Sequence, residues 1–296
     1  MGFLICWSLY GKKKMNGLEK HKNLIEKYKG MLPDKKETKK LESDPEIEQG
    51  LSDLDQIRNR YSELRAIIAF DTTGSMESCI ESVRNNIGEI TNELLEKENN
   101  IHILLAGVGE YCDAPYTLQM KDFRKDAQQL RDDMRSIKNT SGGGPCQVSL
   151  ELLFQELNNR YIQEENKYAL VVFTDQIAHG QDHQEPSPRA DYKKELVKLK
   201  KSLAGFYIIS CTDDGYVINL QKQLLNPESE NERHILLEDV LKDKDLIPNL
   251  LIALIERTIS IDKGNQYLNR LLGGTKKQRE IAETIIKRGY LPPPKQ

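Results

Sequence analysis

The sequence predicts an α/β fold, a doubly wound and mostly parallel sheet flanked by helices. Two observations predict it. Short, nearly continuous apolar runs such as 66–70 and 168–173 have the composition of strands that are buried on both faces. Segments with helical periodicity separate these runs along the chain. Strands that alternate with helices in this way form a parallel sheet with helices on both of its faces.

The expected elements follow one another from residue 65. Strands are expected at 66–70, 101–108, 168–173 and 205–211. The first strand leads into a long amphipathic helix, whose apolar residues recur at spacings of three and four: Met76, Ile80, Val83, Ile87, Ile90 and Leu94. Further helices are expected at 123–137, from Leu150 onward, at 191–203 and at 246–259. The last of these is apolar almost all round, which predicts a buried helix that closes the domain.

Composition limits the class of protein. The 296 residues are 38% hydrophobic and 30% charged, which is typical of a soluble globular protein of one or two domains. A net charge of -3 disfavours a dedicated nucleic-acid binder. The 5 cysteines are scattered and never spaced as CxxC, which indicates reduced thiols rather than a disulfide framework or a zinc site. We therefore expect a cytoplasmic protein.

Three segments are expected along the chain. Residues 1–61 form a leader, a linker and a helical extension, 62–261 form the main domain, and 262–296 form a helical C-terminal tail. The apolar run at 2–10 is too short to span a bilayer, for which about 20 residues are needed. No stable membrane anchor is therefore expected, and the run is either an unstructured leader or an upstream start, with Met15 as the working initiator.

The loop after the first strand carries the clearest chemistry. Asp71, Thr73 and Ser75 alternate, so that an extended turn can direct one carboxylate and two hydroxyls at one point. Such oxygens suit Mg²⁺, which prefers about six oxygen ligands in an octahedron. A second aspartate, Asp175, ends another apolar strand. The alternative is purely structural: Ser75 caps the helix, and Asp71 accepts backbone N–H bonds at its N-terminus.

Several segments together resemble the von Willebrand factor A-type (vWA) domain. AIIAFDTTGSM at 66–76 resembles the first strand and the metal-ion-dependent adhesion site of that family. TDQIAHG at 174–180 is similar to the TDxxxHG segment of an intracellular branch. Weaker likenesses are VGEYCD at 108–113, the glycines at 142–144, and LIPNLLIALIERT at 246–258. The resemblance extends from about Ser62 to Ile261 and implies a Rossmann-like sheet.

The resemblance also implies roles for individual residues. Thr73 and Ser75 would ligate Mg²⁺ or Mn²⁺ directly, while Asp71 and Asp175 would bind the ion or its waters. One feature departs from the family, which usually places a threonine close to the glycine turn, where this chain has Gly144-Pro145-Cys146. Its substitutes would be Thr140, Ser141 or Ser149. His179 is expected to pack or to bond within its own loop, and Tyr111 and Asp113 to lie near the rim of the site.

These features predict a binding protein rather than an enzyme. A cation held mainly by neutral hydroxyls keeps positive charge and a water that an Asp or Glu of a partner protein can displace. The resemblance implies a scaffold role in assemblies with partners such as ATPases or kinases.

One alternative is a Mg²⁺-dependent phosphohydrolase, but Thr73 stands where that chemistry needs a second carboxylate. A second alternative is a metal-free scaffold. Nucleotide binding at 142–144 is disfavoured because no GxxxxGK[ST] or GxGxxG motif is present.

Overall fold

The computed structural model describes residues 64–97, 101–142, 147–162, 166–181, 188–237 and 246–294. All of them belong to one structural unit, Asn59–Gln296. The leader, the linker and the helical extension expected in residues 1–61 lie outside the described residues.

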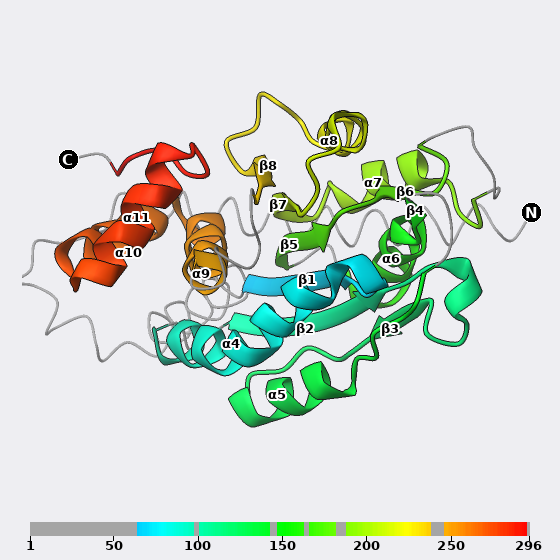
Figure 1. Cartoon of the computed structure of the whole chain (residues 1–296), viewed down its shortest axis with the longest axis horizontal. Helices are drawn as coiled ribbons and strands as arrows, with labels where there is room; N and C mark the ends of the chain where they lie inside the picture. Colours follow the sequence, from blue (N-terminus) through cyan, green and yellow to red (C-terminus); the bar gives the residue numbers. More distant parts are fainter. Residues whose placement is uncertain are drawn as a thin grey trace, which may run out of the picture. The chain divides into compact units, whose positions relative to one another are not determined.

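A mostly parallel sheet runs through this unit (Figure 1). Within the described residues it has six strands in the order β3-β2-β1-β5-β7-β8. Only β3 is antiparallel to its neighbour. The strands are β1 (Leu64–Asp71), β2 (Ile101–Val108), β3 (Leu118–Met120), β5 (Lys167–Thr174), β7 (Leu203–Ser210) and β8 (Glu232–Leu236). A separate parallel pair joins β4 (Gln147–Val148) to β6 (Ile177–Ala178). The expected α/β class, with a mostly parallel sheet, is confirmed.

Helices connect the strands. The α-helices are α4 (Glu77–Lys97), α5 (Ala127–Ser136), α6 (Leu150–Glu156), α7 (Tyr192–Leu199), α8 (Gly215–Gln223), α9 (Leu246–Ile259), α10 (Ile261–Gly273) and α11 (Lys276–Lys287). Short 3-10 turns occur at η1 (Gly74–Met76) and η2 (Tyr111–Asp113), and a π-helical turn, η3 (Leu157–Tyr161), follows α6. Aspartates cap several N-termini, as Asp126 does by accepting a bond from Gln129 N at the start of α5.

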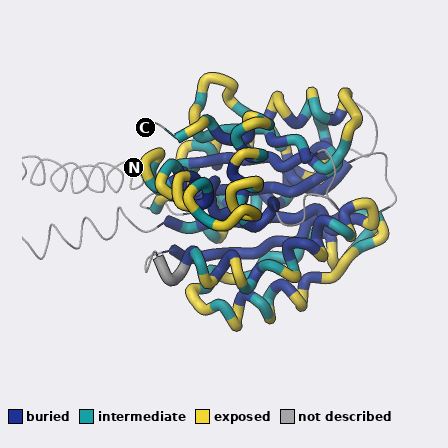
Figure 2. Tube along the Cα trace, turned by 60° about the vertical axis from the view of Figure 1, so that its left-hand side comes forward, coloured by how far each residue is buried: buried dark blue, intermediate teal, exposed yellow. Residues whose placement is uncertain are grey.

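The core lies on both faces of the sheet. Successive side chains of a strand point to opposite faces, so Ile68 and Phe70 join one buried cluster and Ile67 and Ala69 the other. Helices α4, α5, α9, α10 and α11 contribute to the first cluster, and α6 and α7 to the second. In Figure 2 the strands are buried along most of their length, while exposed residues gather on the outer sides of helices and on loops. The apolar runs of the sequence are therefore continuous because both faces are covered.

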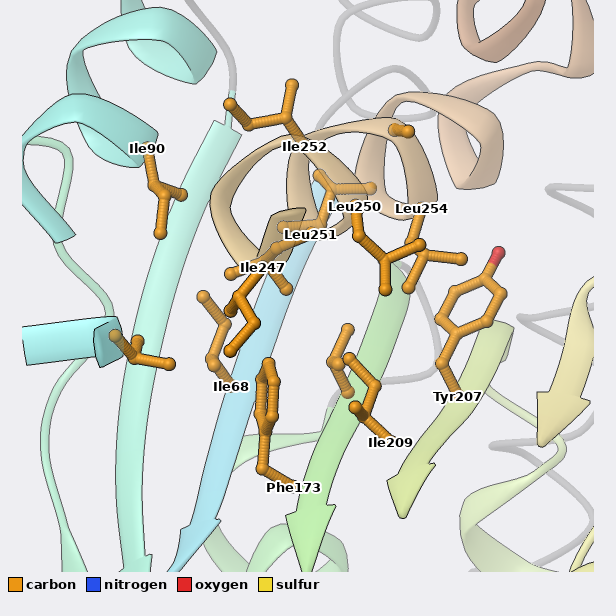
Figure 3. Packing of buried hydrophobic residues seen from close by; sticks show 14 of the residues in the cluster. Ile68, Ile90, Phe173, Tyr207, Ile209, Ile247, Leu250, Leu251, Ile252 and Leu254 are labelled. Carbon is orange, nitrogen blue, oxygen red and sulfur yellow. The ribbon is translucent and has the colours of Figure 1, made fainter. Parts of the chain in front are cut away.

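Helix α9 has the expected buried position. All but two of its residues are buried, and Ile247, Leu250 and Leu251 extend toward Ile68 and Phe173 of the sheet (Figure 3). Its bounds and those of β2 agree with the sequence-based prediction. The prediction missed β3, β8, α8 and the β4–β6 pair, which are short or only partly buried and so carry a weak apolar pattern.

The C-terminal tail packs into the same core. Tyr267, Leu271 and Ile285 of α10 and α11 belong to the buried cluster that covers the first face of the sheet. Gly264 allows α10 to approach α9, because a Cβ there would lie 2.7 Å from Arg257 Cβ. The two tail helices are separated at Gly273 and Gly274, and Thr275 forms a capping box with Gln278 at the start of α11.

None of the helices in the described part of the chain is long and apolar enough to cross a membrane. Cys79, Cys112 and Cys211 are free thiols. Cys6 and Cys146 lie outside the described residues.

Candidate metal centre

The strand order reverses between β1 and β5. From β1 the chain builds the sheet outward through β2 and β3, and it later adds β5, β7 and β8 on the other side. Asp71 is the last residue of β1, and Asp175 follows directly after β5. Phe70 pairs with Phe173 in parallel register, so both aspartates come to the same edge of the sheet. Open α/β sheets bind ligands at this kind of switch point.

Asp71 is fully buried and holds the loop that follows it. Its Oδ1 accepts bonds from Thr73 N at 3.0 Å and from Thr73 Oγ1 at 2.6 Å. Its Oδ2 accepts a bond from Thr174 Oγ1, at the end of β5, at 2.9 Å. Residues Gly74–Met76 then form the 3-10 turn that leads into α4. The carboxylate therefore ties the loop of β1 to the neighbouring strand.

The two hydroxyls of the predicted motif lie side by side. Thr73 Oγ1 is 3.4 Å from Ser75 Oγ. Neighbouring ligands of an octahedral Mg²⁺ with bonds of about 2.1 Å are separated by roughly 3 Å, so only a small adjustment would place both oxygens on one ion. Thr73 is buried, whereas Ser75 is exposed. A cation between these hydroxyls would thus be reached from solvent on the side of Ser75.

Burial makes negative charge at the site costly. The pKa of Asp71 is raised from 3.8 to about 7, mainly because burial disfavours the charged carboxylate, and the charge of Asp175 raises it further. The bonds from Thr73 and Thr174 act in the opposite direction. Asp175 Oδ1 is buried and accepts no hydrogen bond from any group in the described ranges. A buried carboxyl group with a second carboxyl group nearby suits a bound cation.

The donor set fits a hard divalent ion. It consists of two carboxylates and two hydroxyls, which are ligands suited to Mg²⁺ or Mn²⁺. The described residues contain no group of three or more His, Cys, Asp or Glu side chains that could hold a metal, so a centre here depends on the hydroxyls of Thr73 and Ser75. The structure therefore places Asp71, Thr73 and Ser75 in one loop, with Asp175 at the same edge of the sheet.

Thr140 lies beside this set but contacts a different residue. Its Oγ1 is 3.2 Å from Thr72 Oγ1, and its backbone N donates to Thr72 O at 2.7 Å. Asp113 supports the same segment, since its Oδ1 accepts from Gly142 N at 3.2 Å and its Oδ2 from Glu110 N at 2.8 Å. Residues 143–146, which hold most of the glycine turn, lie outside the described residues. Thr140 thus braces the loop after β1 through Thr72, one residue before the predicted ligand Thr73.

Gln176 also lies at the site, although no sequence pattern predicts it. Its Nε2 donates to Thr73 Oγ1 at 3.3 Å, which places its side-chain amide against one of the predicted ligands. No motif indicates this contact. The only signal is its position directly after Asp175.

A second polar group, which we call the His179 cluster, consists of Glu110, Tyr111, Gln147, Glu151 and His179. His179 Nε2 is 2.5 Å from Glu110 Oε1, and its Nδ1 is 2.8 Å from Gln147 Oε1. The Tyr111 ring stacks on the imidazole with ring centroids 4.0 Å apart, and Tyr111 Oη donates to Glu151 Oε1 at 2.5 Å. His179 is fully buried, so it packs as expected, but its partners belong to other segments rather than to its own loop.

The His179 cluster carries its own electrostatic cost. Burial raises the pKa of Glu151 from 4.5 to about 7, and the bond from Tyr111 partly opposes this. Burial lowers the pKa of His179, while Glu110 opposes that shift. Arg189 lies over the other face of Tyr111, with its guanidinium carbon 4.2 Å from the ring centroid. The cluster joins η2, β4, α6 and the segment after β6, and Tyr111 contacts both His179 and Glu151 within it.

Tyr111→Phe is expected to lower the free energy of unfolding by about 1–3 kcal/mol, because Glu151 Oε1 loses the hydroxyl that donates to it inside the protein. Urea unfolding at pH 8 measures the change. Tyr116→Phe is the matched control, since Tyr116 is 46% exposed and is expected to change little. Equal stability of the two variants would contradict a structural role for the cluster.

Comparisons with known proteins show a fold but no family. No protein-family model matches the sequence, and no curated protein matches it. Among solved structures, the chain is similar to the pilus adhesin SpaC from Lactobacillus rhamnosus GG in its open conformation. That match has a TM-score of 0.50 and 11% identity, and covers 66% of this chain and 30% of the adhesin. A second form of SpaC matches with a TM-score of 0.50 and 11% identity, over 66% of this chain and 31% of the adhesin.

The chain is also similar to proximal thread matrix protein 1 from the mussel byssus, with a TM-score of 0.48 and 11% identity over 65% of this chain and 48% of the other. The chain thus spans less than half the length of these proteins. The SpaC matches support the α/β fold and carry nothing about function at this level of identity.

Proposed function

We propose that residues 62–261 form a vWA-like domain that holds Mg²⁺ or Mn²⁺ and uses the ion to bind an acidic side chain of a partner protein. The main support is the buried carboxyl group of Asp71, with the partly buried Asp175 at the same edge of the sheet and the hydroxyls of Thr73 and Ser75 in the loop after β1. The resemblance of segments 66–76 and 174–180 to the vWA family agrees with this position. We place the protein in the cytoplasm as part of the same proposal.

The ligand set favours binding of an anion. The divalent ion would supply a positive charge and exchangeable water positions, and a carboxylate of the partner can take such a position. Neutral hydroxyls from Thr73 and Ser75 leave more of the ion's charge available to the partner than carboxylates would. The exposed side of the site, at Ser75, is the side on which a partner carboxylate can approach.

The geometry gives less support to the alternative phosphohydrolase. A nucleophilic aspartate needs a free carboxylate oxygen facing its substrate. Both oxygens of Asp71 accept hydrogen bonds, and the side chain is fully buried. The position two residues later carries the hydroxyl of Thr73, which donates to Asp71 and cannot act as a general acid and base in the way of a carboxyl group.

Saturable binding of Mn²⁺ to the full chain is expected, and Asp71→Ala is expected to abolish it, because the variant removes one of the two carboxyl groups that offset the ion's charge. Titration calorimetry with Mn²⁺ and with Mg²⁺ measures the affinity. Asp132→Ala is the control, since Asp132 lies exposed on α5 and should leave the affinity unchanged. A native chain that binds neither ion would instead support the metal-free scaffold.

The Mn²⁺-loaded protein also tests whether the ion keeps a coordination position that a partner can occupy. Mn²⁺ that keeps exchangeable water enhances the relaxation of water protons, and a carboxylate that replaces the water reduces the enhancement. We expect a short peptide with one glutamate to reduce it, and the same peptide with glutamine to leave it unchanged. An identical response to both peptides would contradict carboxylate recognition.

A further inference from the structure

Gln176 is held in place at the candidate metal centre by its backbone. Its N–H is bonded to Thr174 Oγ1 at 2.9 Å, and its carbonyl oxygen accepts from Gln221 Nε2, on α8, at 2.8 Å. The residue is thus fixed between the end of β5 and the helix that follows β7. The side-chain amide is therefore presented to the site from a rigid base.

The amide is only half satisfied. Nε2 donates to Thr73 Oγ1 at 3.3 Å, near the long end of the range for such bonds. Oε1 is buried and has no hydrogen-bond partner within the described part of the chain. A buried carbonyl oxygen without a donor is destabilising, because it has lost its bonds to water and gained none in the protein. Asp175 Oδ1, on the preceding residue, is unpartnered in the same way. Two consecutive residues after β5 therefore each have a buried acceptor oxygen without a partner among the described residues.

We propose that Gln176 supplies a neutral oxygen ligand to the divalent ion at this site. The inference rests on the proposed function and adds a ligand to it. A half-turn of the amide about its last torsion exchanges Nε2 and Oε1, breaks only the 3.3 Å bond to Thr73 and brings the oxygen to the side of that hydroxyl. A separation of 3.3 Å is close to the roughly 3 Å between neighbouring ligands of an octahedral ion.

This ligand would take the place of the threonine that the vWA family usually has close to the glycine turn and that this chain lacks at 144–146. The only threonine close before the glycine turn, Thr140, has its hydroxyl against Thr72 rather than Thr73. An amide oxygen is neutral, as a hydroxyl is, and so adds to the coordination number without reducing the positive charge offered to a partner. Gln176 would therefore determine both the affinity for the ion and the strength with which the ion binds a carboxylate.

Titration calorimetry with Mn²⁺ on the full chain tests the role. Gln176→Ala is expected to weaken Mn²⁺ binding about tenfold, because one oxygen ligand is lost. Gln176→Met keeps the length and volume of the side chain without its polar atoms and should show the same loss if Gln176→Ala fails to fold. Gln181→Ala is the matched control: its Oε1 accepts from Ala178 N and its Nε2 donates to Leu220 O, so it should keep the native affinity.

Gln176→Glu separates a ligand from a residue that only packs. A carboxylate in the same place is expected to tighten Mn²⁺ binding about tenfold and to weaken the effect of the glutamate peptide on water relaxation, because the ion then carries less net charge. Native or tighter binding of Mn²⁺ by Gln176→Ala and Gln176→Met would overturn the proposal, since the amide would then compete with the ion for Thr73. Failure of the proposed function looks different: the native chain would bind no Mn²⁺, or Asp71→Ala would still bind it.

Discussion

Asp71→Asn is expected to stabilise the metal-free protein at pH 8 while abolishing its Mn²⁺ binding. The folded protein buries a carboxyl group whose pKa is about 7, against an ordinary value of 3.8. At pH 8 this group is charged in the folded state and is poorly solvated there. Asparagine has nearly the same shape and keeps an acceptor oxygen for Thr73, but it carries no charge to bury. The expected gain is about 2–4 kcal/mol in the free energy of unfolding.

The stability advantage of Asp71→Asn should depend on pH, because the pKa of Asp71 differs between the folded and unfolded states. Between about pH 4 and pH 7 the folded state keeps a proton on Asp71 that the unfolded chain has lost, so the native protein loses stability as the pH rises through this window. Above about pH 7 the Asp71 carboxyl group is charged in both the folded and the unfolded state, so its effect on the free energy of unfolding no longer changes with pH. Urea unfolding in EDTA at pH 5, 6, 7 and 8 should therefore show the advantage of Asp71→Asn growing with pH.

Added Mn²⁺ should reverse the order of the two proteins or narrow the gap between them. At a free concentration one hundred times its Kd, a ligand stabilises the folded state by about 2.7 kcal/mol, and only the native chain gains this. Asp132→Asn, on the exposed surface of α5, serves as the control and should follow the native protein at every pH. An advantage of Asp71→Asn that stays constant from pH 5 to pH 8 would contradict a buried carboxyl with a raised pKa.

Phe173→Ala is expected to cost about 3–5 kcal/mol of stability, the largest loss among the variants considered. The Phe173 ring lies on the central strand β5, is fully buried, and stacks on Phe70 of β1 with ring centroids 5.6 Å apart. Helix α9 covers it (Figure 3). Truncation leaves a cavity that this helix and the two strands cannot close without moving. Thermal and urea unfolding measure the loss.

Phe173→Ala removes packing directly beside the candidate metal centre. Phe70 and Phe173 immediately precede Asp71 and Thr174, whose side chains are bonded to each other. Val197→Ala is the control, because Val197 is 64% exposed on α7 and its truncation should change the stability by less than about 0.5 kcal/mol. A loss below about 1 kcal/mol for Phe173→Ala would mean that the buried cluster on this face of the sheet repacks freely around the position.

The apolar pattern was sufficient to predict the central elements. Strands β1, β2, β5 and β7 are buried on both faces, so each is a continuous apolar run that is visible without any neighbour. The same pattern placed Asp71 and Asp175 at strand ends. Edge strands β3 and β8 were not found, because their residues are partly exposed and their pairing depends on the strand beside them.

The candidate site was predicted where its residues are local in the chain. Asp71, Thr73 and Ser75 form one loop, and their alternation already indicates convergent oxygens. Gln176 and the His179 cluster were beyond reach, because their contacts join residues 32 to 103 positions apart. Patterns within a short stretch of sequence do not indicate contacts between residues so far apart.

The sequence by itself determined the central strands and most of the helices, and which oxygens can converge after β1, because periodicity and turn chemistry act between residues close in the chain. The tertiary structure alone decided the strand order, and with it the meeting of Asp71 and Asp175 at the switch point. It also decided the raised pKa of Asp71 and the half-satisfied amide of Gln176. Desolvation and hydrogen bonding across the sheet depend on what surrounds a group in space, and only the folded chain sets those surroundings.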